Sequence, residues 1–416
     1  MNYKKATEPT SPLRILLVTQ YFYPENFKSN DIAFELSKKG YKVTVLTGIP
    51  NYPTGSFFKG YGVFRKRRER IHGVKVIRAF LFPRGNGGGI RIALNYLSWA
   101  IFASFHACFH ACFHTYDAVI VHAPSPITQG IPALIIKKLR KTSMYLWVLD
   151  LWPESLVAAG GITNKTILGI FTKLVRLLYS HSSKILIASQ GFKHSILDKG
   201  DYAHKLIYFP NWAEDVFSHT HTSLPIPNLP LGFLVMFAGN IGEAQDVKNL
   251  MRCAMILKAR TDIKFIFIGN GRKKPWLDAY ITQNGLHETV YALGQHPLEI
   301  MPVLFQKADL LLLALKDAPI FSLTIPSKLQ AYMASGRPIV AMLNGDGAQL
   351  IANSGCGKAV AAGNYRELAD VILSMTSKSL HEREEIGAKG RAYFLHNFRI
   401  DICIDKLCSI LQEECQ

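Results

Sequence analysis

Short apolar runs alternate with longer mixed segments along most of the chain. The runs predict buried strands, and the mixed segments predict helices that cover them. Strands are expected at 14–19, 42–47, 74–80, 118–121, 145–149, 184–188, 233–238, 264–269, 290–293, 309–314, 338–342 and 358–360. Helices are expected at 30–39, 125–140, 165–181, 190–198, 247–259 and 274–284, and again toward the C-terminus. This alternation is typical of parallel sheets with helices on both faces.

The alternation stops once and then begins again. Pro210-Asn-Trp212 and the polar, proline-rich stretch 218–230 have the composition of a linker. A chain of 416 residues also exceeds what one core usually fills. The predicted fold is α/β, with two Rossmann-like, doubly wound domains facing each other across a cleft. The expected parts are a disordered extension at 1–12, an N-terminal domain at 13–209, a linker at 210–230, a C-terminal domain at 231–390, and helices at 391–416 that could pack back on the first domain.

Charge narrows the class of partner. The chain has 48 lysines and arginines against 30 acidic residues, a net charge of +18, which favours an anionic partner. The densest basic cluster, 65–70, has little aromatic interleaving, and the sequence has no recognisable nucleic-acid-binding signature, so a lipid surface or a phosphorylated substrate is preferred. Seven cysteines without a CxxC pair, and a polar segment at 1–12 in place of a secretory signal, predict the cytosolic side.

Residues 92–113 are long enough to cross a bilayer core. Polar residues interrupt them, namely Asn95, Ser98, Ser104, His106 and His110. The preferred interpretation is therefore a helix that dips into one leaflet or contacts a lipid acceptor. A plain core helix is the second choice, and a helix that spans the bilayer is the third. The repeat at 105–114 places three histidines on one helix face, and a metal site there is the weaker alternative to a face near an interface. The cluster 65–70 and Arg91 would face acidic headgroups.

A candidate anion site lies at 322–340. This segment is expected to contain a helix that starts at Pro326 and Ser327, carries Lys328 in its first turn, and ends at Gly336. The free N–H groups at the start of such a helix attract phosphate, and a lysine adds a full positive charge. The alternative is a capped structural helix with an exposed lysine.

Three loops that follow strands of the first half carry further candidate chemistry. The loop 21–30 can offer N–H groups to a phosphate or to sugar hydroxyls, although its asparagines could instead cap the next helix. His122 follows a strand and could bind a sugar or move a proton. Asp150, Trp152 and Glu154 combine carboxylates with an indole, as carbohydrate sites do, although Asp150 could equally be an N-cap.

Two glycine-rich turns follow strands of the second half. Gly239-Asn-Ile-Gly242 and Gly269-Asn-Gly271 would let a diphosphate or a base approach the backbone. Neither turn is a full GxGxxG motif. A Walker A sequence is also absent from the chain, which argues against ATP hydrolysis.

Several strings together resemble the GT-B glycosyltransferases of family 4, and within them the WbuB-type subgroup. The strings are Thr19-Gln-Tyr-Phe-Tyr-Pro-Glu25, Pro50-Asn-Tyr-Pro53, Asp150-Leu-Trp-Pro-Glu-Ser155, Pro210-Asn-Trp212, Phe237-Ala-Gly-Asn-Ile-Gly242, Pro326-Ser-Lys328 and Gly336-Arg-Pro338. The resemblance implies retaining transfer of an N-acetylated aminosugar, such as N-acetylfucosamine, from a UDP-sugar to a polyprenyl-diphosphate-linked glycan of O-antigen or capsule. It implies no metal and no further cofactor, because helix dipoles and basic side chains stabilise the leaving diphosphate.

The resemblance also assigns residues. Expected catalytic residues are His122, Asp150, Glu154 and Lys328. Expected donor contacts are Asn240, Gly242, Lys248, Gly269, Asn270, Gly271, Pro326, Ser327 and Gln330. Expected acceptor contacts are Glu25, Asn26, Asn30, Asn51, Tyr52 and Trp152.

This chain departs from the pattern of the family at the donor site. The two glutamates of most family members fall on Leu323 and Ala331, and the arginine and lysine after the first strand of the second domain fall on Asn240 and Asp246. The diphosphate is then expected to depend more on Lys328, with Lys248 a weaker candidate.

The sequence thus predicts a glycosyltransferase on the cytoplasmic face of the inner membrane, peripheral or monotopic, whose partners are a nucleotide sugar, a lipid-linked acceptor and the membrane surface. The rivals are a GDP- or UDP-hexosyltransferase of the same fold, a UDP-sugar epimerase, and a non-catalytic sugar-nucleotide-binding protein.

Overall fold

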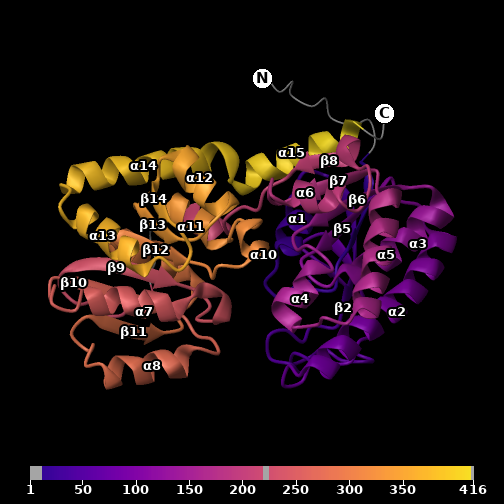
Figure 1. Cartoon of the computed structure of the whole chain (residues 1–416). Helices are drawn as coiled ribbons and strands as arrows, with labels where there is room; N and C mark the ends of the chain where they lie inside the picture. Colours follow the sequence, from indigo (N-terminus) through magenta and orange to yellow (C-terminus); the bar gives the residue numbers. More distant parts are fainter. Residues whose placement is uncertain (1–11, 219–223, 414–416) are drawn as a thin grey trace. The chain divides into compact units, whose positions relative to one another are not determined.

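The computed structural model describes residues 12–218 and 224–413, and the chain forms two compact units. The first unit contains the chain up to Ala188, Phe192–Phe209 and the end from Ile404; the second contains Ser189–Gly191 and Pro210–Cys403. Each unit has its own sheet with helices around it (Figure 1). The extension predicted at 1–12 lies outside the described residues except for Pro12.

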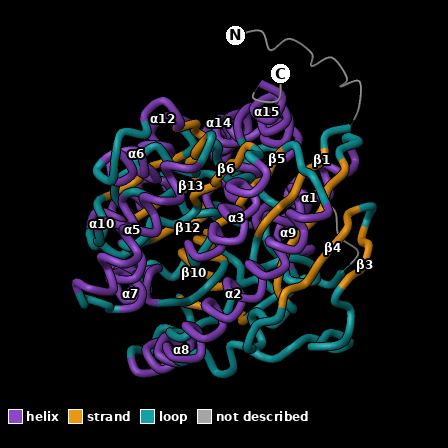
Figure 2. The backbone as a smooth tube through the Cα atoms, turned by 90° about the vertical axis from the view of Figure 1, so that its right-hand side faces the viewer, coloured by secondary structure: helices purple, strands orange, loops and turns teal. Residues whose placement is uncertain are grey.

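The first unit is built on an eight-stranded sheet of order β3-β4-β2-β1-β5-β6-β7-β8. Its strands are β1 (Arg14–Val18), β2 (Lys42–Gly48), β3 (Arg68–Ile71), β4 (Val74–Ala79), β5 (Ala118–Ala123), β6 (Ser143–Val148), β7 (Lys184–Ile187) and β8 (Leu206–Tyr208). Its helices are α1 (Lys28–Lys38), α2 (Gly89–Phe113), α3 (Gly130–Arg140), α4 (Glu154–Gly160), α5 (Lys165–His181) and α6 (Phe192–Leu197). All neighbouring strands are parallel except β3, which pairs antiparallel with β4 at the edge (Figure 2).

The second unit has a six-stranded parallel sheet of order β11-β10-β9-β12-β13-β14. The strands are β9 (Phe233–Ala238), β10 (Ile263–Ile268), β11 (Val290–Gly294), β12 (Leu310–Ala314), β13 (Ile339–Met342) and β14 (Gly357–Val360). The helices are α7 (Val247–Ile256), α8 (Lys274–Gln283), α9 (Met301–Lys307), α10 (Pro319–Ser322), α11 (Lys328–Ser335), α12 (Asp346–Ser354), α13 (Tyr365–Thr376) and α14 (Leu380–Asn397).

The last helix, α15 (Ile400–Glu413), crosses the boundary between the units, and its part from Ile404 belongs to the first. There the ammonium of Lys39 lies 2.5 Å from Asp405 Oδ1, and Gln412 Nε2 donates to the Tyr41 hydroxyl at 3.2 Å.

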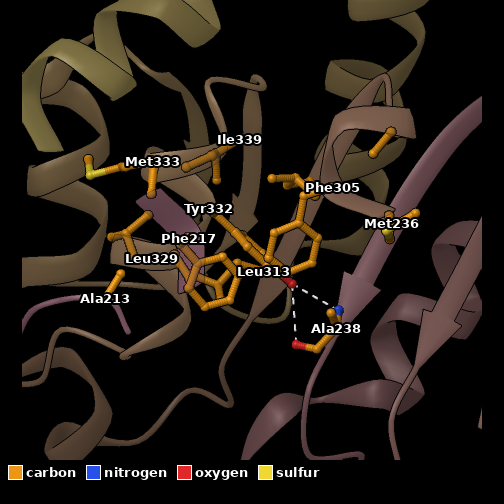
Figure 3. Packing of buried hydrophobic residues seen from close by; sticks show 14 of the residues in the cluster. Ala213, Phe217, Met236, Ala238, Phe305, Leu313, Leu329, Tyr332, Met333 and Ile339 are labelled. Carbon is orange, nitrogen blue, oxygen red and sulfur yellow. Dashed lines mark hydrogen bonds between the residues drawn. The ribbon is translucent and has the colours of Figure 1, made fainter. Parts of the chain in front are cut away.

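Both faces of the second sheet are buried, which explains why its strands are almost wholly apolar. Val235 and Phe237 of β9 point into one hydrophobic cluster, and Met236 and Ala238 point into the other. Figure 3 shows part of the second cluster, where Tyr332 of α11 packs against Phe305 of α9, with 5.2 Å between the ring centroids. The strand ends that carry the glycine turns are therefore held from both sides of the sheet.

The predicted α/β fold with two parallel, Rossmann-like sheets is confirmed. Six elements escaped the prediction, namely β3, β8, α4, α9, α10 and α12. Strand β3 has the sequence Arg-Glu-Arg-Ile and overlaps the basic cluster 65–70, for which no strand was predicted. An edge strand with one solvated side needs no apolar run, so it leaves no such signal in the sequence. Helix α2 also starts at Gly89, before the expected 92. Helix α5 and the start of α11 lie where they were predicted.

Candidate functional site

Lys328 lies at the start of α11, with its side chain folded against the end of β9. Its Nζ is 3.9 Å from the centroid of the Phe237 ring, a cation–π contact. The nitrogen is buried, and within the described parts of the chain no group accepts a hydrogen bond from it. Burial lowers the pKa of this ammonium to about 7, because a cation is poorly solvated there. The predicted alternative of an exposed surface lysine is therefore wrong.

Gly239 makes room for this lysine. Its φ is +121°, a conformation that side chains disfavour, and a Cβ at this position would lie 2.5 Å from Cε and 3.0 Å from Nζ of Lys328. The next turn supports Gly239 from behind, because a Cβ on Gly269 would collide with the Gly239 carbonyl and one on Gly271 with the Ile241 carbonyl. The two glycine turns and Lys328 thus form one cradle of bare backbone around a single cation, here called the glycine–lysine cradle.

Tyr332 fixes the cradle to the sheet. It lies one turn after Lys328 on α11, and its hydroxyl accepts from Ala238 N–H at 2.8 Å and lies 3.3 Å from Ala238 O (Figure 3). Since Ala238 directly precedes Gly239, the helix that carries the lysine is tied to the strand that ends in the glycine. Sequence reasoning predicted the turn that begins at Gly239 but missed Tyr332, although Tyr332 stood at the helical i+4 position from Lys328.

The remaining predicted donor contacts differ in their surroundings. Asn240 and Asn270 are exposed beside the cradle, and the Asn270 side chain accepts from Gly271 N–H at 2.8 Å. Lys248 is exposed in the first turn of α7 and lines a small hollow with Gly242.

Gln330 and the start of α11 complete the donor predictions. Gln330 is 1% exposed, and its amide, oriented to donate, bonds the carbonyls of Pro326 and Ser327 at 3.2 and 3.0 Å. Gln330 therefore holds the start of α11 and does not offer its side chain to a ligand.

His122 was expected after the strand but is the penultimate residue of β5, and it is almost wholly buried. Its Nδ1 is 3.3 Å from the Thr19 hydroxyl, and Nε2 has no hydrogen-bond partner among the described residues. Burial, with the Lys28 cation second, lowers the pKa of His122 to about 3. The imidazole is therefore neutral at pH 7. It can donate or accept a hydrogen bond in this state, but it carries no extra proton to act as a general acid.

The side chains of Asp150, Trp152 and Glu154 do not form the single group that was predicted, because each contacts different partners. Asp150 accepts from the Ser155 hydroxyl, and burial raises its pKa to about 6. The Trp152 indole is 5% exposed and packs on Phe171 of α5 with centroids 5.1 Å apart, so it is a core residue and not a free sugar platform.

Glu154 has partners of its own in the same unit. It pairs with Lys199 at 2.5 Å and accepts from the Ser195 hydroxyl at 2.7 Å. Burial acts to raise the pKa of Glu154, but these hydrogen bonds outweigh it and the pKa lies below its usual range. Of the three predicted side chains, only Asp150 keeps a titratable group suited to proton transfer.

The predicted acceptor residues of the first loop mostly hold the loop itself. The Asn51 and Tyr52 N–H groups donate to Glu25 Oε1 at 2.8 and 2.7 Å, and burial raises the pKa of this carboxyl to about 7. Asn30 accepts from Tyr23 N–H and donates to Glu25 O, and so does not cap α1. Asn26 and Tyr52 are exposed, which leaves them available to a ligand.

Besides Lys328, the structure shows a second notable cation, Arg84, which sequence reasoning missed. Its guanidinium is 5.9, 5.2 and 5.3 Å from the ring centroids of Tyr21, Tyr52 and Tyr96, and it donates to the Tyr96 hydroxyl at 2.6 Å. No described carboxylate pairs with it. Four separate segments supply these residues, so spacing along the chain could not reveal the group.

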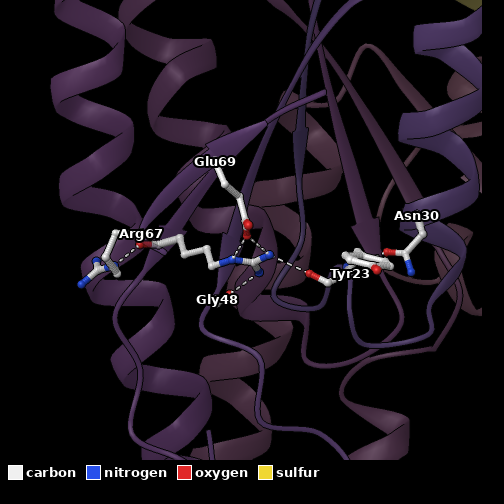
Figure 4. Close-up of polar contacts among 6 residues, drawn as sticks. Tyr23, Asn30, Gly48, Arg67 and Glu69 are labelled. Atoms are coloured by element: carbon white, nitrogen blue, oxygen red, sulfur yellow. Dashed lines mark hydrogen bonds and ion pairs between the residues drawn. The ribbon is translucent and has the colours of Figure 1, made fainter. Parts of the chain in front are cut away.

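A hollow of about 680 Å³ opens on the same unit. Tyr23, Phe57, Phe58 and Tyr61 line it with their rings, together with Lys59, Lys66 and Glu69. The wholly buried Arg78 holds Glu69 at 2.7 Å and also donates to the carbonyls of Tyr23 and Gly48 (Figure 4). Rings and a fixed carboxylate together suit a sugar.

Within the described ranges 12–218 and 224–413, no three His, Cys, Asp or Glu side chains lie close enough together to hold a metal ion. In the histidine repeat, His110 contacts the Tyr116 hydroxyl at 3.2 Å and lies 4.6 Å from the His114 ring.

The second unit matches a known protein family. Residues 232–378 fit the profile described as Glycosyl transferases group 1, a range that contains the whole glycine–lysine cradle. The chain has the GT-B fold and is a glycosyltransferase. The WbuB-type subgroup of this enzyme stays a prediction.

Individual relatives of this glycosyltransferase agree with that result. It is 24% identical to the probable glycosyltransferase WbjE of Pseudomonas aeruginosa over 295 residues, 68% of this chain and 72% of that one. It is also 24% identical to the putative colanic acid biosynthesis glycosyl transferase WcaI of Escherichia coli K12, over 72% of this chain and 75% of the relative. The crystal structure of Anabaena Alr3699/HepE in complex with UDP superposes with a TM-score of 0.70 at 14% identity, over 96% of this chain and 100% of that one.

Proposed function

We propose that this glycosyltransferase moves an N-acetylated aminosugar, N-acetylfucosamine or a close analogue, from a UDP-sugar to a polyprenyl-diphosphate-linked glycan, with retention at the anomeric carbon. The observation that carries the proposal is the buried, unpaired ammonium of Lys328 within bare glycine backbone. A buried cation without a counter-ion is costly, and an anionic ligand would remove that cost. The UDP found in the structure of HepE supports a nucleoside diphosphate as that anion.

In the proposed reaction, the bond between the anomeric carbon and the diphosphate oxygen breaks and a bond to an acceptor hydroxyl oxygen forms. The acceptor proton passes to the departing diphosphate. Lys328 then faces the charge that develops on the leaving group, in a site where a fixed cation stabilises the transition state more than it would in water. The neutral imidazole of His122 and the carboxylate of Asp150 orient hydroxyl groups of the donor sugar or the acceptor.

The acceptor is proposed to bind on the first unit. Tyr52, Asn26 and the ring-lined hollow offer exposed surfaces of the kind that sugars contact, and Arg84 offers a cation without a paired carboxylate. The name of WcaI, which mentions colanic acid, supports a glycan of the cell surface as the product, and O-antigen or capsule are the proposed classes.

Donor binding provides the direct test. UDP should bind most tightly when Lys328 is protonated, so the dissociation constant measured by calorimetry should rise by up to about tenfold per pH unit above pH 7. Lys328→Met should bind weakly and without this dependence. A wild type with no pH dependence, or a Met variant that keeps it, contradicts a role for Lys328 in donor binding.

Transfer requires a second experiment. UDP- and GDP-sugars are supplied as a panel with polyprenyl-diphosphate glycans, and products are read by mass spectrometry. Transfer of a UDP-N-acetylaminosugar supports the proposal, whereas a hexose product establishes the hexosyltransferase alternative. UDP binding with no transfer to any acceptor would indicate a binding protein.

A further inference from the structure

Helix α2 exposes a continuous apolar stripe. Seven large side chains that are 48% to 80% exposed recur every three or four residues, and so lie along one face of the helix. They are Ile90, Leu94, Leu97, Ile101, Phe105, Phe109 and Phe113. At 1.5 Å per residue the stripe is about 35 Å long. Soluble surfaces rarely expose so long a contiguous apolar patch without a partner.

The opposite face of α2 is packed into the first unit. Trp99, Ala103 and Ala107 are fully buried, and α2 packs along α3. Asn95 donates to the Phe82 carbonyl at 2.6 Å, and Arg140 of α3 donates to the carbonyls of Ala111 and Cys112.

By length and composition alone, α2 could cross a membrane. A spanning helix, however, would have to leave these contacts along its whole length. The packed face instead favours a helix that lies flat with one side exposed.

Cations flank the stripe on the neighbouring β3–β4 pair. Arg70 and Lys75 are directly opposite each other in the antiparallel register, and Arg68 shares the exposed side of β3 with Arg70. Like charges in cross-strand pairs are unfavourable without a counter-ion, yet none of these three pairs with a carboxylate in the part of the chain that the structure describes. The three residues are here called the β3–β4 cations.

Two of these cations, Arg68 and Lys75, lie near α2. The pKa of His106 is lowered by burial and then by Arg67 and Arg68, and that of His110 by burial, His114 and Lys75. An apolar stripe bordered by unpaired cations matches the two layers of an anionic lipid surface, because acyl chains accept the rings and headgroups accept the charges.

We propose that α2 and the β3–β4 cations form a docking surface on which the enzyme rests on an anionic bilayer, with α2 lying in the plane of the interface. The inference adds the membrane to the proposed function, since a polyprenyl-linked acceptor resides there. It is tested without donor or acceptor, so its failure is distinguishable from failure of the transferase proposal, and Lys328→Met should bind vesicles as the wild type does.

Vesicle sedimentation tests the surface. The full-length enzyme should bind vesicles that contain phosphatidylglycerol, bind pure phosphatidylcholine more weakly, and lose affinity as salt rises. The double variant F105S/F109S should lower the partition coefficient more than tenfold, because two phenyl rings leave the acyl region. Its matched control is L231S/L380S, two exposed leucines of the second unit, which should bind normally.

The charges are tested in the same way. R68Q/R70Q should reduce binding to anionic vesicles about fivefold for each arginine, with little effect on neutral vesicles. The control K358Q/R366Q removes two exposed cations of the second unit and should have no effect. Wild type that ignores anionic vesicles, or stripe and control variants that behave alike, overturns the proposal. So does a lipid-free dimer that F105S/F109S dissociates, because a second copy would then cover the stripe.

Orientation is tested with a fluorophore attached at Leu94→Cys or at Phe113→Cys, each in a C108S/C112S background, because these two native thiols of α2 are exposed. A helix in the plane of the interface places both labels at equal depth, within reach of the same lipid-borne quenchers. Labels at opposite surfaces of the bilayer would establish a spanning helix and contradict the in-plane arrangement.

Discussion

The glycine–lysine cradle and the first loop of the N-terminal sheet both lie at the carboxyl ends of parallel strands, yet they are built in opposite ways. The cradle removes side chains, so that Gly239, Gly269 and Gly271 expose backbone around one cation. The first loop, residues 21–30, adds them: the Asn30 side chain donates to the Glu25 carbonyl, and the Glu25 carboxyl accepts from the backbone N–H of Asn51 in the next loop. Bare backbone suits a constant ligand part such as a diphosphate, whereas a loop of side chains can change from one acceptor to another.

The largest effect is expected from the one cation of the cradle. Lys328→Ala should lower kcat/KM about 100- to 1,000-fold, the range that follows removal of one charge-stabilising donor. Lys248→Ala, on the exposed start of α7, is the matched control and should change kcat/KM by less than about tenfold. Steady-state assays with the donor found in the panel give both values. A larger loss of kcat/KM in Lys248→Ala would show that the diphosphate binds near Lys248 and not in the cradle.

The first loop should show its own signature in stability. The pKa of Glu25 is about 7 in the folded protein, above the ordinary value of 4.5, so the folded state holds a proton that the unfolded state releases between these pH values. The free energy of unfolding should therefore fall as pH rises from 4.5 to 7, by up to about 3 kcal/mol. Urea titrations of Glu25→Gln should lose the Glu25 part of this slope and keep a smaller fall below pH 6 that belongs to Asp150, while those of exposed Asp201→Asn should retain the whole slope.

Crowding the cradle should have an intermediate effect. Gly239→Ala places a methyl group 2.5 Å from Cε of Lys328 in a strained backbone conformation, and should lower donor affinity at least about tenfold. Gly294→Ala separates the two causes, because its φ is +78° but nothing lies within 4 Å of a Cβ. If both variants lose the same affinity, strain alone explains the loss and the contact with Lys328 is irrelevant.

The smallest effect is expected from the tether. Tyr332→Phe removes the hydroxyl that bonds Ala238, leaving a buried N–H without its side-chain partner. Stability should fall by about 1 to 2 kcal/mol, and KM for the donor should rise with kcat little changed. Denaturant unfolding and steady-state kinetics measure these quantities. An unchanged KM would show that the cradle keeps its shape without the tether.

The sequence carried the information for much of this comparison. Periodicity located most strands and helices, and Pro326, Ser327 and Gly336 marked the ends of α11 correctly. Local pattern could not show that Lys328 is buried, that Gly239 touches it, or that Arg84 meets three tyrosines from distant segments, because these are contacts of the folded chain. Trp152 and Glu154 misled for the same reason, since their partners Phe171 and Lys199 are set by tertiary packing.

The contact between Gly239 and Lys328 also limits which substitutions can be accepted at these two positions during evolution. A larger residue at 239 is tolerated only if the side chain at 328 becomes shorter, and restoring the lysine requires the glycine first. The two positions are therefore expected to change together or not at all. A single substitution is then not enough to replace the cation that binds the diphosphate. Because φ at Gly239 is +121°, libraries that vary both sites at once should return glycine at 239 in every active clone that keeps lysine at 328.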